Sequence, residues 1–200
     1  MHPSTLHYWL HGGERGGRFY PPVIRPEPTD NRTVTWAEFV ESGWLRTYRR
    51  QRGIPMYELR RFIELLRDQL DVPYPLAHKR PFVSGKRLVF KLQEESQLEP
   101  EFRLVDDQLM LTYAASMFFQ RVEWTGDVAT GWKPDENPKS TVIVKPDIRF
   151  GRPAVGGVST ASIYEQSEAG ASNGEIAETF GLAEKDVRWA LAYENARAAS

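Results

Sequence analysis

The residue types that most often carry catalysis are scattered along this chain and form no recognisable catalytic motif. His7 and His11 are spaced like two metal ligands on one helix face, but no H-E-x-x-H pattern surrounds them and no third ligand is in view. Asp106 and Asp107 lie in a polar stretch, which predicts solvated carboxylates. The glycine pairs near the N-terminus follow no convincing strand, so they match neither a phosphate-binding loop nor a dinucleotide fingerprint. We therefore expect no enzyme, no metal and no cofactor; an enzyme of unrecognised type is the least favoured alternative.

Composition limits the class of protein and its compartment. The chain has no cysteine, which excludes disulfides, cysteine-based zinc sites and thiol catalysis. Hydrophobic residues make up 40% and charged residues 26%, values typical of a globular protein. No apolar run approaches the ~20 residues of a membrane span, and the first residues lack the apolar segment of a signal peptide. We therefore expect a cytoplasmic protein with no membrane partner.

Basic residues are concentrated toward the N-terminus. Residues 1–80 hold 13 Lys and Arg against 9 Asp and Glu, whereas residues 81–140 hold 7 against 10 and residues 141–200 hold 6 against 8. Because phosphate neutralisation supplies much of the affinity for nucleic acid, any such contact is expected in the first 80 residues. Ordinary charge scatter is the alternative explanation of so modest an excess.

The first 75 residues predict a short helix, a basic glycine-rich hairpin and two further helices. Residues 4–11 favour the helix, with Ser4 as its N-cap and an apolar face directed to a core. Residues 19–24 and 33–35 are expected to pair as a hairpin across a long loop. A capping box beginning at Thr35 predicts the next helix, and an amphipathic helix is expected over about residues 55–71.

This order of elements is typical of a winged helix-turn-helix, in which a helix reads base edges and a hairpin contacts phosphates or a minor groove. The predicted DNA-binding residues are Ser4, Thr5, His7, Tyr8, Arg15, Arg18, Arg25 and Arg32. The segment S-T-L-H-Y-W at residues 4–9 resembles the S-T-L-R-Y-W segment in the recognition helix of MerR-family regulators. That family has a further helix before this point, so the first helix of the module is expected to be missing here. The alternative is that residues 4–11 merely pack.

Residues 76–138 are expected to form a small α+β connector after a proline-rich boundary. Residues 87–91 predict a strand, and residues 108–111 predict a second strand or the start of a helix. A hairpin is expected about Thr125-Gly126-Asp127, whereas residues 113–121 favour neither helix nor strand.

Residues 139–200 predict a strand at 141–144 followed by three helices near 160–169, 172–180 and 183–198. Three motifs stand out, namely F-G-R-P at 150–153, E-I-A-E-T-F-G-L at 175–182 and V-R-W-A-L-A-Y at 187–193. Together they resemble a helix-turn-helix domain that was long catalogued as a domain of unknown function and is associated with VapB-type antitoxins. The resemblance implies neutralisation of a PIN-domain ribonuclease toxin.

Charge favours a protein partner over DNA for this second module, since residues 168–200 hold six acidic and three basic residues. Trp189 and Tyr193 lie four apart on one helix face and are expected at a toxin or dimer interface, with packing in their own core as the alternative. Arg149 or Arg152 is expected to pair with the clustered carboxylates of the toxin. The alternative is that Arg152 braces its own turn.

These observations predict an α+β, mainly α fold in three parts: a MerR-like winged region at 1–75, a connector at 76–138 and an antitoxin-type helix-turn-helix domain at 139–200. The predicted function is that of a VapBC-like antitoxin that also binds operator DNA for autorepression. A stand-alone MerR-like regulator is the alternative. A homodimer is expected, formed through either the 55–71 helix or the C-terminal module.

Overall fold

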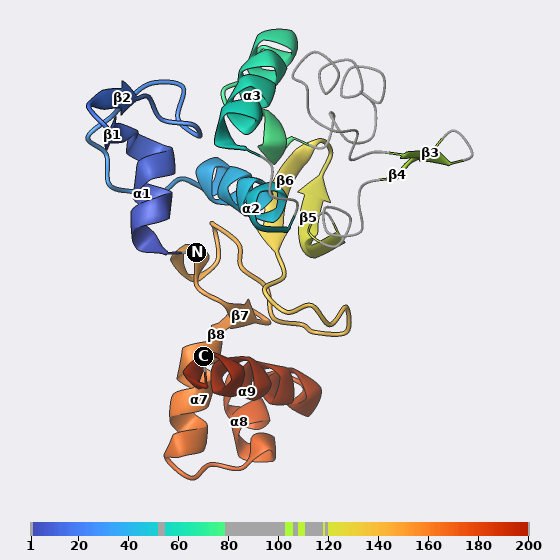
Figure 1. The fold of residues 1–200 in the computed structure, drawn as a ribbon. Coiled ribbons are helices and arrows are strands. Elements are labelled where there is room, and N and C mark those ends of the chain that lie inside the picture. The colour runs from blue at the N-terminus through green and yellow to red at the C-terminus, as the bar shows by residue number, and fades with distance from the viewer. Residues whose placement is uncertain are drawn as a thin grey trace. The chain divides into compact units, whose positions relative to one another are not determined.

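The computed structural model describes residues 2–51, 55–78, 103–105, 108–110, 118 and 120–199. They form two compact units: unit 1 is Met1–Phe119 with Thr125–Ala129, and unit 2 is Gln120–Trp124 with Thr130–Ser200. Figure 1 shows helices with small two-stranded sheets in the described residues. The predicted mixed α and β class, rich in helix, is confirmed. No helix in these residues is long and apolar enough to cross a membrane.

Unit 1 begins with a helix and a hairpin, followed by two long helices. Its elements are α1 (Pro3–His11), β1 (Gly13–Arg15), β2 (Arg18–Tyr20), α2 (Trp36–Gln51), α3 (Met56–Leu70), the 3-10 helix η1 (Pro75–Ala77), β3 (Arg103–Val105) and β4 (Gln108–Met110). β1 pairs with β2, and β3 pairs with β4, both antiparallel. The helices predicted near 4–11, from Thr35 and over 55–71 are confirmed, including the Thr35 capping box, in which Glu38 accepts from Thr35 N at 2.8 Å.

The core of unit 1 joins one face of each helix. The buried apolar side chains are Trp9 and Leu10 from α1, Val40, Trp44, Leu45 and Tyr48 from α2, and Leu59, Phe62, Ile63 and Leu66 from α3. Their spacing of three and four residues keeps them on one side of each helix. This amphipathic spacing therefore fixes which face of α1, α2 and α3 is left for solvent or ligand.

Unit 2 contains the three helices that its sequence predicts. They are α7 (Thr160–Glu168), α8 (Asn173–Phe180) and α9 (Glu184–Ala198), preceded by the hairpin of β7 (Ala154–Val155) with β8 (Val158–Ser159). Ser172 caps α8 in a complete capping box with Glu175, and Gly181 ends the helix with a left-handed φ of 65°. The helices enclose an apolar cluster that includes Val142, Ile163, Ile176, Val187 and Ala190.

β5 (Val122–Thr125) and β6 (Val128–Trp132) pair with each other about the Gly126 turn, as predicted. The strand predicted over 141–144 is wrong in detail, since Ile143 and Val144 make only isolated bridges, to Ala154 and Trp132. The strand predicted over 87–91 and most of the segment 113–121 lie outside the described residues.

Two local predictions in unit 1 are wrong. Ser4 is not the N-cap of α1; His2 is, because its Nδ1 accepts from Ser4 N at 3.3 Å while Pro3 occupies the first turn. The hairpin does not pair residues 19–24 with 33–35. It closes instead about Gly16 and Gly17, whose φ angles of 57° and 73° suit a two-residue turn with both central residues left-handed.

Candidate nucleic-acid interface

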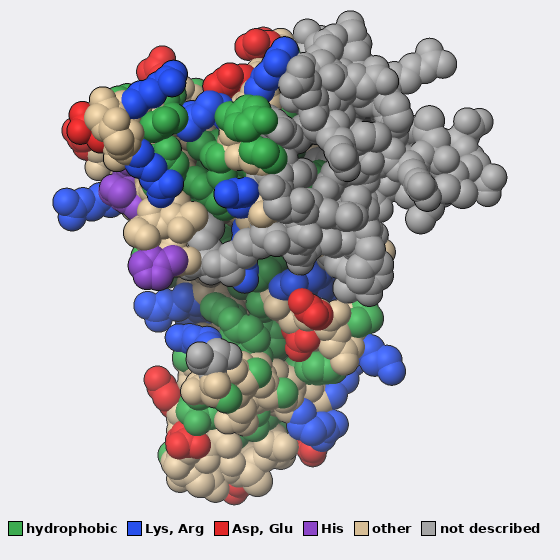
Figure 2. All heavy atoms as spheres, viewed as in Figure 1, with side chains coloured by type: hydrophobic (Ala, Val, Ile, Leu, Met, Phe, Trp, Pro, Cys, Tyr) green, Lys and Arg blue, Asp and Glu red, His purple; other side chains and the backbone are tan. Residues whose placement is uncertain are grey.

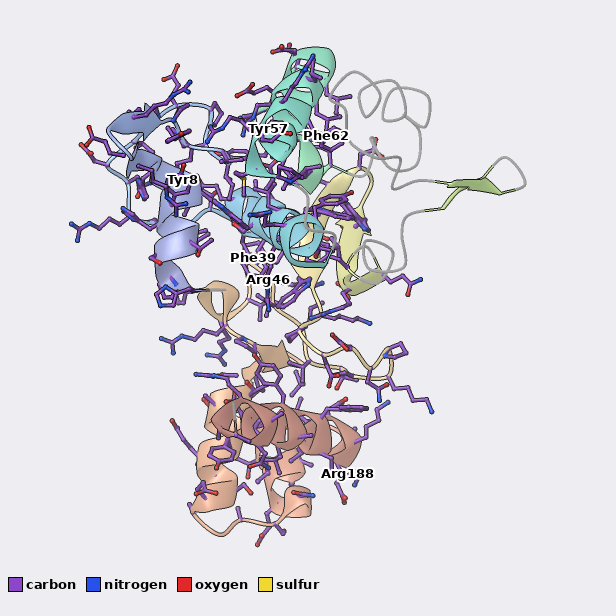
Figure 3. All side chains as sticks on the ribbon, viewed as in Figure 1. Tyr8, Phe39, Arg46, Tyr57, Phe62 and Arg188 are labelled. Carbon is purple, nitrogen blue, oxygen red and sulfur yellow. The ribbon has the colours of Figure 1, made fainter. Side chains whose placement is uncertain are left out.

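α1 presents a polar face next to the hairpin. Its buried Trp9 and Leu10 leave Ser4 and His7 exposed, while Thr5 and Tyr8 are half-buried. The rings of His7 and His11 stack with their centroids 4.5 Å apart. Figure 3 labels Tyr8 on this helix. A short helix with exposed hydroxyl and imidazole groups carries donors and acceptors suited to base edges.

The β1–β2 hairpin carries two arginines at opposite positions of its strands. Arg15 and Arg18 are exposed and form the register pair next to the turn. The Arg15 Cζ lies 4.7 Å from the centre of the Tyr8 ring, which links hairpin and helix by a cation–π contact. The Arg18 Cζ lies 5.5 Å from the centre of the Tyr20 ring, so the two guanidinium groups contact different aromatic rings. Figure 2 shows Lys and Arg side chains and histidines gathered over the region of α1 and the hairpin.

Gly12 sets the close approach of helix and hairpin. Its φ is 73°, and a Cβ at this position would lie 2.4 Å from the Tyr20 carbonyl oxygen. Val23 N and Ile24 N both donate to the Trp9 carbonyl, at 2.8 and 3.0 Å. The C-terminal end of α1 is therefore held by hydrogen bonds from the segment that follows the hairpin, and Gly12 allows the close approach to β2.

Arg25 has a structural role, and its predicted phosphate contact is wrong. Its side chain is 3% exposed and pairs with both carboxylate oxygens of Glu38, at 2.7 and 3.3 Å. Its Nη1 donates to the Asn31 carbonyl at 2.6 Å, and its Nη2, which also bonds Glu38, donates to the Thr33 carbonyl at 2.9 Å. Because these bonds occupy the guanidinium inside the protein, it holds the segment before α2 in place. Arg32, in contrast, is exposed, and its predicted role stays a prediction.

The pKa of Glu38 reflects this pairing. Burial raises the pKa of its carboxyl, but the hydrogen bonds from Arg25, from the Thr35 backbone and from Tyr74 outweigh burial and hold the pKa below its ordinary value. Glu38 is therefore ionised across the neutral range, and the buried pair with Arg25 is a true ion pair.

Two arginines of α3 position the same region, and the sequence analysis did not single them out. Arg60 Nη1 donates to the Pro22 carbonyl at 2.7 Å. Arg67 Nη2 donates to the carbonyls of Val23 and Ile24, and its Nε donates to Pro73. The two lie seven residues apart, close to two helical turns, which is the available signal that they share one face.

The sequence analysis singled out four residues of unit 2, two on α9 and two in the segment before β7. Trp189 and Tyr193 are half-buried and pack against its apolar cluster, so packing in the core accounts for part of each side chain. Burial, with the nearby Glu194 carboxylate, raises the pKa of the Tyr193 hydroxyl. Arg149 and Arg152 are exposed in the segment before β7. The partner roles of all four residues stay predictions.

The part of the chain that the structure describes contains no group of three His, Asp or Glu side chains able to hold a metal ion. The exposed Ser4 and His7 of α1 and the exposed Arg15 and Arg18 of the hairpin supply hydrogen-bond donors, acceptors and positive charge, which are the groups that bind an anionic polymer.

Comparisons with known proteins bear on both units. The family described as a protein of unknown function (DUF433) matches residues 142–193. The uncharacterized protein Rv2308 of Mycobacterium tuberculosis is 31% identical over 197 residues, which are 95% of this chain and 83% of that protein. The crystal structure of Rv2018 from Mycobacterium tuberculosis has a similar fold, with a TM-score of 0.72 at 20% identity over 94% of this chain and 90% of the other.

Proposed function

This chain belongs to the family of the uncharacterized mycobacterial protein Rv2308, and from the geometry of unit 1 and the sequence motifs of unit 2 we propose that it is a DNA-binding antitoxin of a VapBC-like system. Unit 1 binds operator DNA, and unit 2 binds a PIN-domain ribonuclease toxin. The observation that carries the DNA-binding half is the polar face of α1 beside the opposed Arg15 and Arg18 of the hairpin.

Three features of unit 1 support DNA binding. The exposed Ser4 and His7 on α1 offer hydrogen bonds to base edges. The hairpin carries two exposed guanidinium groups for phosphates, and none of the ion pairs found among the described residues neutralises either. The buried Arg25 and the close approach at Gly12 hold helix and hairpin in a defined relation, which reduces the entropy lost on binding.

The test of DNA binding uses the full chain and a duplex from immediately upstream of its own gene. Fluorescence anisotropy across a salt series measures how many phosphates are neutralised, since each contributes about 0.9 to the slope of log affinity against log salt. We expect the double variant Arg15→Ala/Arg18→Ala to lower that slope by about 2. The matched control is Arg188→Ala/Arg197→Ala, which removes two exposed cations of α9 from unit 2. An equal loss in both variants would contradict a hairpin interface.

The antitoxin half is supported by the F-G-R-P and E-I-A-E-T-F-G-L motifs and by the excess of acidic residues in the helices of unit 2. Its test is co-purification with the protein encoded by the adjacent gene, followed by a ribonuclease assay of that protein alone and in complex. A stoichiometric complex without ribonuclease activity supports the proposal. A chain that binds DNA but not this neighbour favours a stand-alone MerR-like regulator instead.

A further inference from the structure

The loop that precedes β7 has an unusual backbone. Arg149, Phe150 and Gly151 have φ angles of 49°, 56° and 74°, so three consecutive residues are left-handed. For residues other than glycine this conformation is strained, and such residues cluster at binding sites. The strained backbone at Arg149 and Phe150 therefore indicates a role of this loop besides reversing the direction of the chain.

That backbone displays an aromatic ring to solvent. The exposed fraction of Phe150 is 100%, the highest among the large hydrophobic residues found exposed in the described part of the chain. Phe19 on the β1–β2 hairpin, for comparison, is 54% exposed. Phenylalanine gains free energy when its ring leaves water, and Phe150 realises none of that gain in the free chain.

The loop is nevertheless closed by hydrogen bonds of its own and is tied to the rest of unit 2 through Arg149. Gly151 N donates to the Ile148 carbonyl and Arg152 N donates to the Arg149 carbonyl, both at 3.1 Å. Arg149 Nε donates to the Gly157 carbonyl at 3.0 Å, which ties the loop to the turn between β7 and β8. These hydrogen bonds fix the backbone at Phe150, so the loop loses little conformational entropy when Phe150 binds a partner.

Positive charge flanks the ring. Arg149 and Arg152 are exposed, and neither takes part in an ion pair with the acidic side chains that the structure describes. Lys145 differs, since its Nζ pairs with Glu123 at 2.9 Å. An exposed aromatic side chain with exposed arginines close to it in the sequence has the composition typical of the residues that dominate protein interfaces.

We propose that the loop Arg149–Arg152 anchors a partner protein whose surface has an apolar pocket rimmed by carboxylates. Phe150 enters the pocket, and Arg149 and Arg152 pair with the carboxylates. This inference rests on the proposed function for the partner, the PIN-domain protein encoded next door, and it deepens that function by naming the contact. An acidic protein surface complements the charge of Arg149 and Arg152, whereas a symmetric contact between the loops of two copies would bring the same two arginines against each other.

The decisive variant is Phe150→Gly in the full chain, with affinity for the purified neighbour measured by calorimetry. Glycine adopts a left-handed φ without strain, so the free energy of unfolding should stay the same or rise. Loss of the anchor should weaken the affinity at least about 30-fold, as for other interface hot spots. Arg149→Ala/Arg152→Ala should weaken it and flatten its salt dependence, whereas Phe19→Ala should leave it unchanged.

Three results would overturn the inference. If the wild-type chain binds the neighbour and Phe150→Gly binds within twofold, the loop is not the anchor although the antitoxin proposal stands. If the wild-type chain does not bind the neighbour, both proposals fail together. If Phe150→Gly instead converts an oligomer of the free chain to monomers in light scattering, the occupant is a second copy.

Discussion

The interiors of the two units differ in chemistry. Unit 1 buries Arg25, Glu38 and Glu41 among its apolar side chains, and α3 adds arginines that donate to backbone carbonyls. In the described residues of unit 2 the buried polar side chains are Ser140 and Thr160, neither of which is ionisable, and the rest of its core is apolar. Unit 1 is thus held partly by the buried ion pair of Arg25 with Glu38. In unit 2 the Lys145–Glu123 ion pair is partly exposed, and helix caps and apolar packing hold the interior.

This difference has a consequence for function. A buried ion pair fixes geometry well but tolerates the loss of one partner badly, whereas an apolar core tolerates many single changes with graded cost. The unit that carries the proposed DNA interface therefore depends on a few charged contacts. Substitutions of buried and of exposed charged residues, compared with each other, test whether the stability of unit 1 depends on its buried charged contacts.

The largest effect is expected from Arg25→Met, which leaves the Glu38 carboxylate buried without its main partner. Removing one partner of a buried pair costs about 3–5 kcal/mol, so the free energy of unfolding of unit 1 should fall by that amount. Hydrogen exchange measured by mass spectrometry on the full chain reports the loss peptide by peptide. Protection should fall in α1, α2 and α3 and stay unchanged in α7, α8 and α9.

Two variants control for this interpretation. Arg46→Met removes an exposed arginine of α2, labelled in Figure 3, and should change stability by less than about 0.5 kcal/mol. The double variant Arg25→Met/Glu38→Met removes both charges and should recover a large part of the loss. A double variant as unstable as Arg25→Met would show that the hydrogen bonds to the Asn31 and Thr33 carbonyls matter more than the charge.

Glu41 should make the stability of unit 1 depend on pH. Burial raises its pKa to about 8, although the Leu76 backbone N–H at 3.0 Å and Arg67 act in the opposite direction. The folded state thus binds a proton that the unfolded state releases near pH 4.5, so stability is lost as pH rises toward 8. Chemical unfolding at pH 6 and pH 8 should differ by about 2 kcal/mol for unit 1.

The matched comparison is between Glu41→Gln and Glu165→Gln. A glutamine in place of Glu41 keeps the shape of the side chain without its ionisation, so the difference between pH 6 and pH 8 should vanish. Glu165 is exposed in α7 of unit 2, and its replacement should preserve the pH dependence. Equal pH dependence in Glu41→Gln and the wild-type chain would mean that another group titrates.

The difference between local contacts in unit 2 and buried charged contacts in unit 1 explains which features could be predicted from the sequence. The helices of unit 2 follow from local signals, namely the Ser172 capping box, the Gly181 turn and apolar spacing, and their predicted bounds differ little from the observed ones. In unit 1 the helices also follow from spacing, but the role of Arg25 does not. Its partner Glu38 lies 13 residues away, beyond any periodic pattern, so the sequence alone assigns an arginine in a basic segment to DNA.

The loop at Phe150 illustrates a second limit of the sequence. The F-G-R-P motif is visible there, and Arg149 and Arg152 stand out because charge can be read from a sequence. Phe150 does not stand out, because phenylalanine is a residue type that is usually buried. Its exposure follows from left-handed backbone angles at two residues that rarely adopt them, which no composition or periodicity reveals.

The smallest effect is expected in unit 2, from Ser172→Ala. The Ser172 Oγ accepts from the Glu175 backbone N–H, and the Glu175 carboxylate accepts from Ser172 in return, which lowers the pKa of Glu175. Loss of an N-cap costs about 1 kcal/mol, so exchange should accelerate in α8 while unit 1 is unaffected. Ser172→Asp keeps a capping oxygen and should restore protection, whereas Thr179→Ala, at an exposed position of the same helix, should not lower it. Equal exchange in Ser172→Ala and Ser172→Asp would mean that tertiary packing alone holds α8, and the contrast between locally determined and long-range units would lose its simplest support.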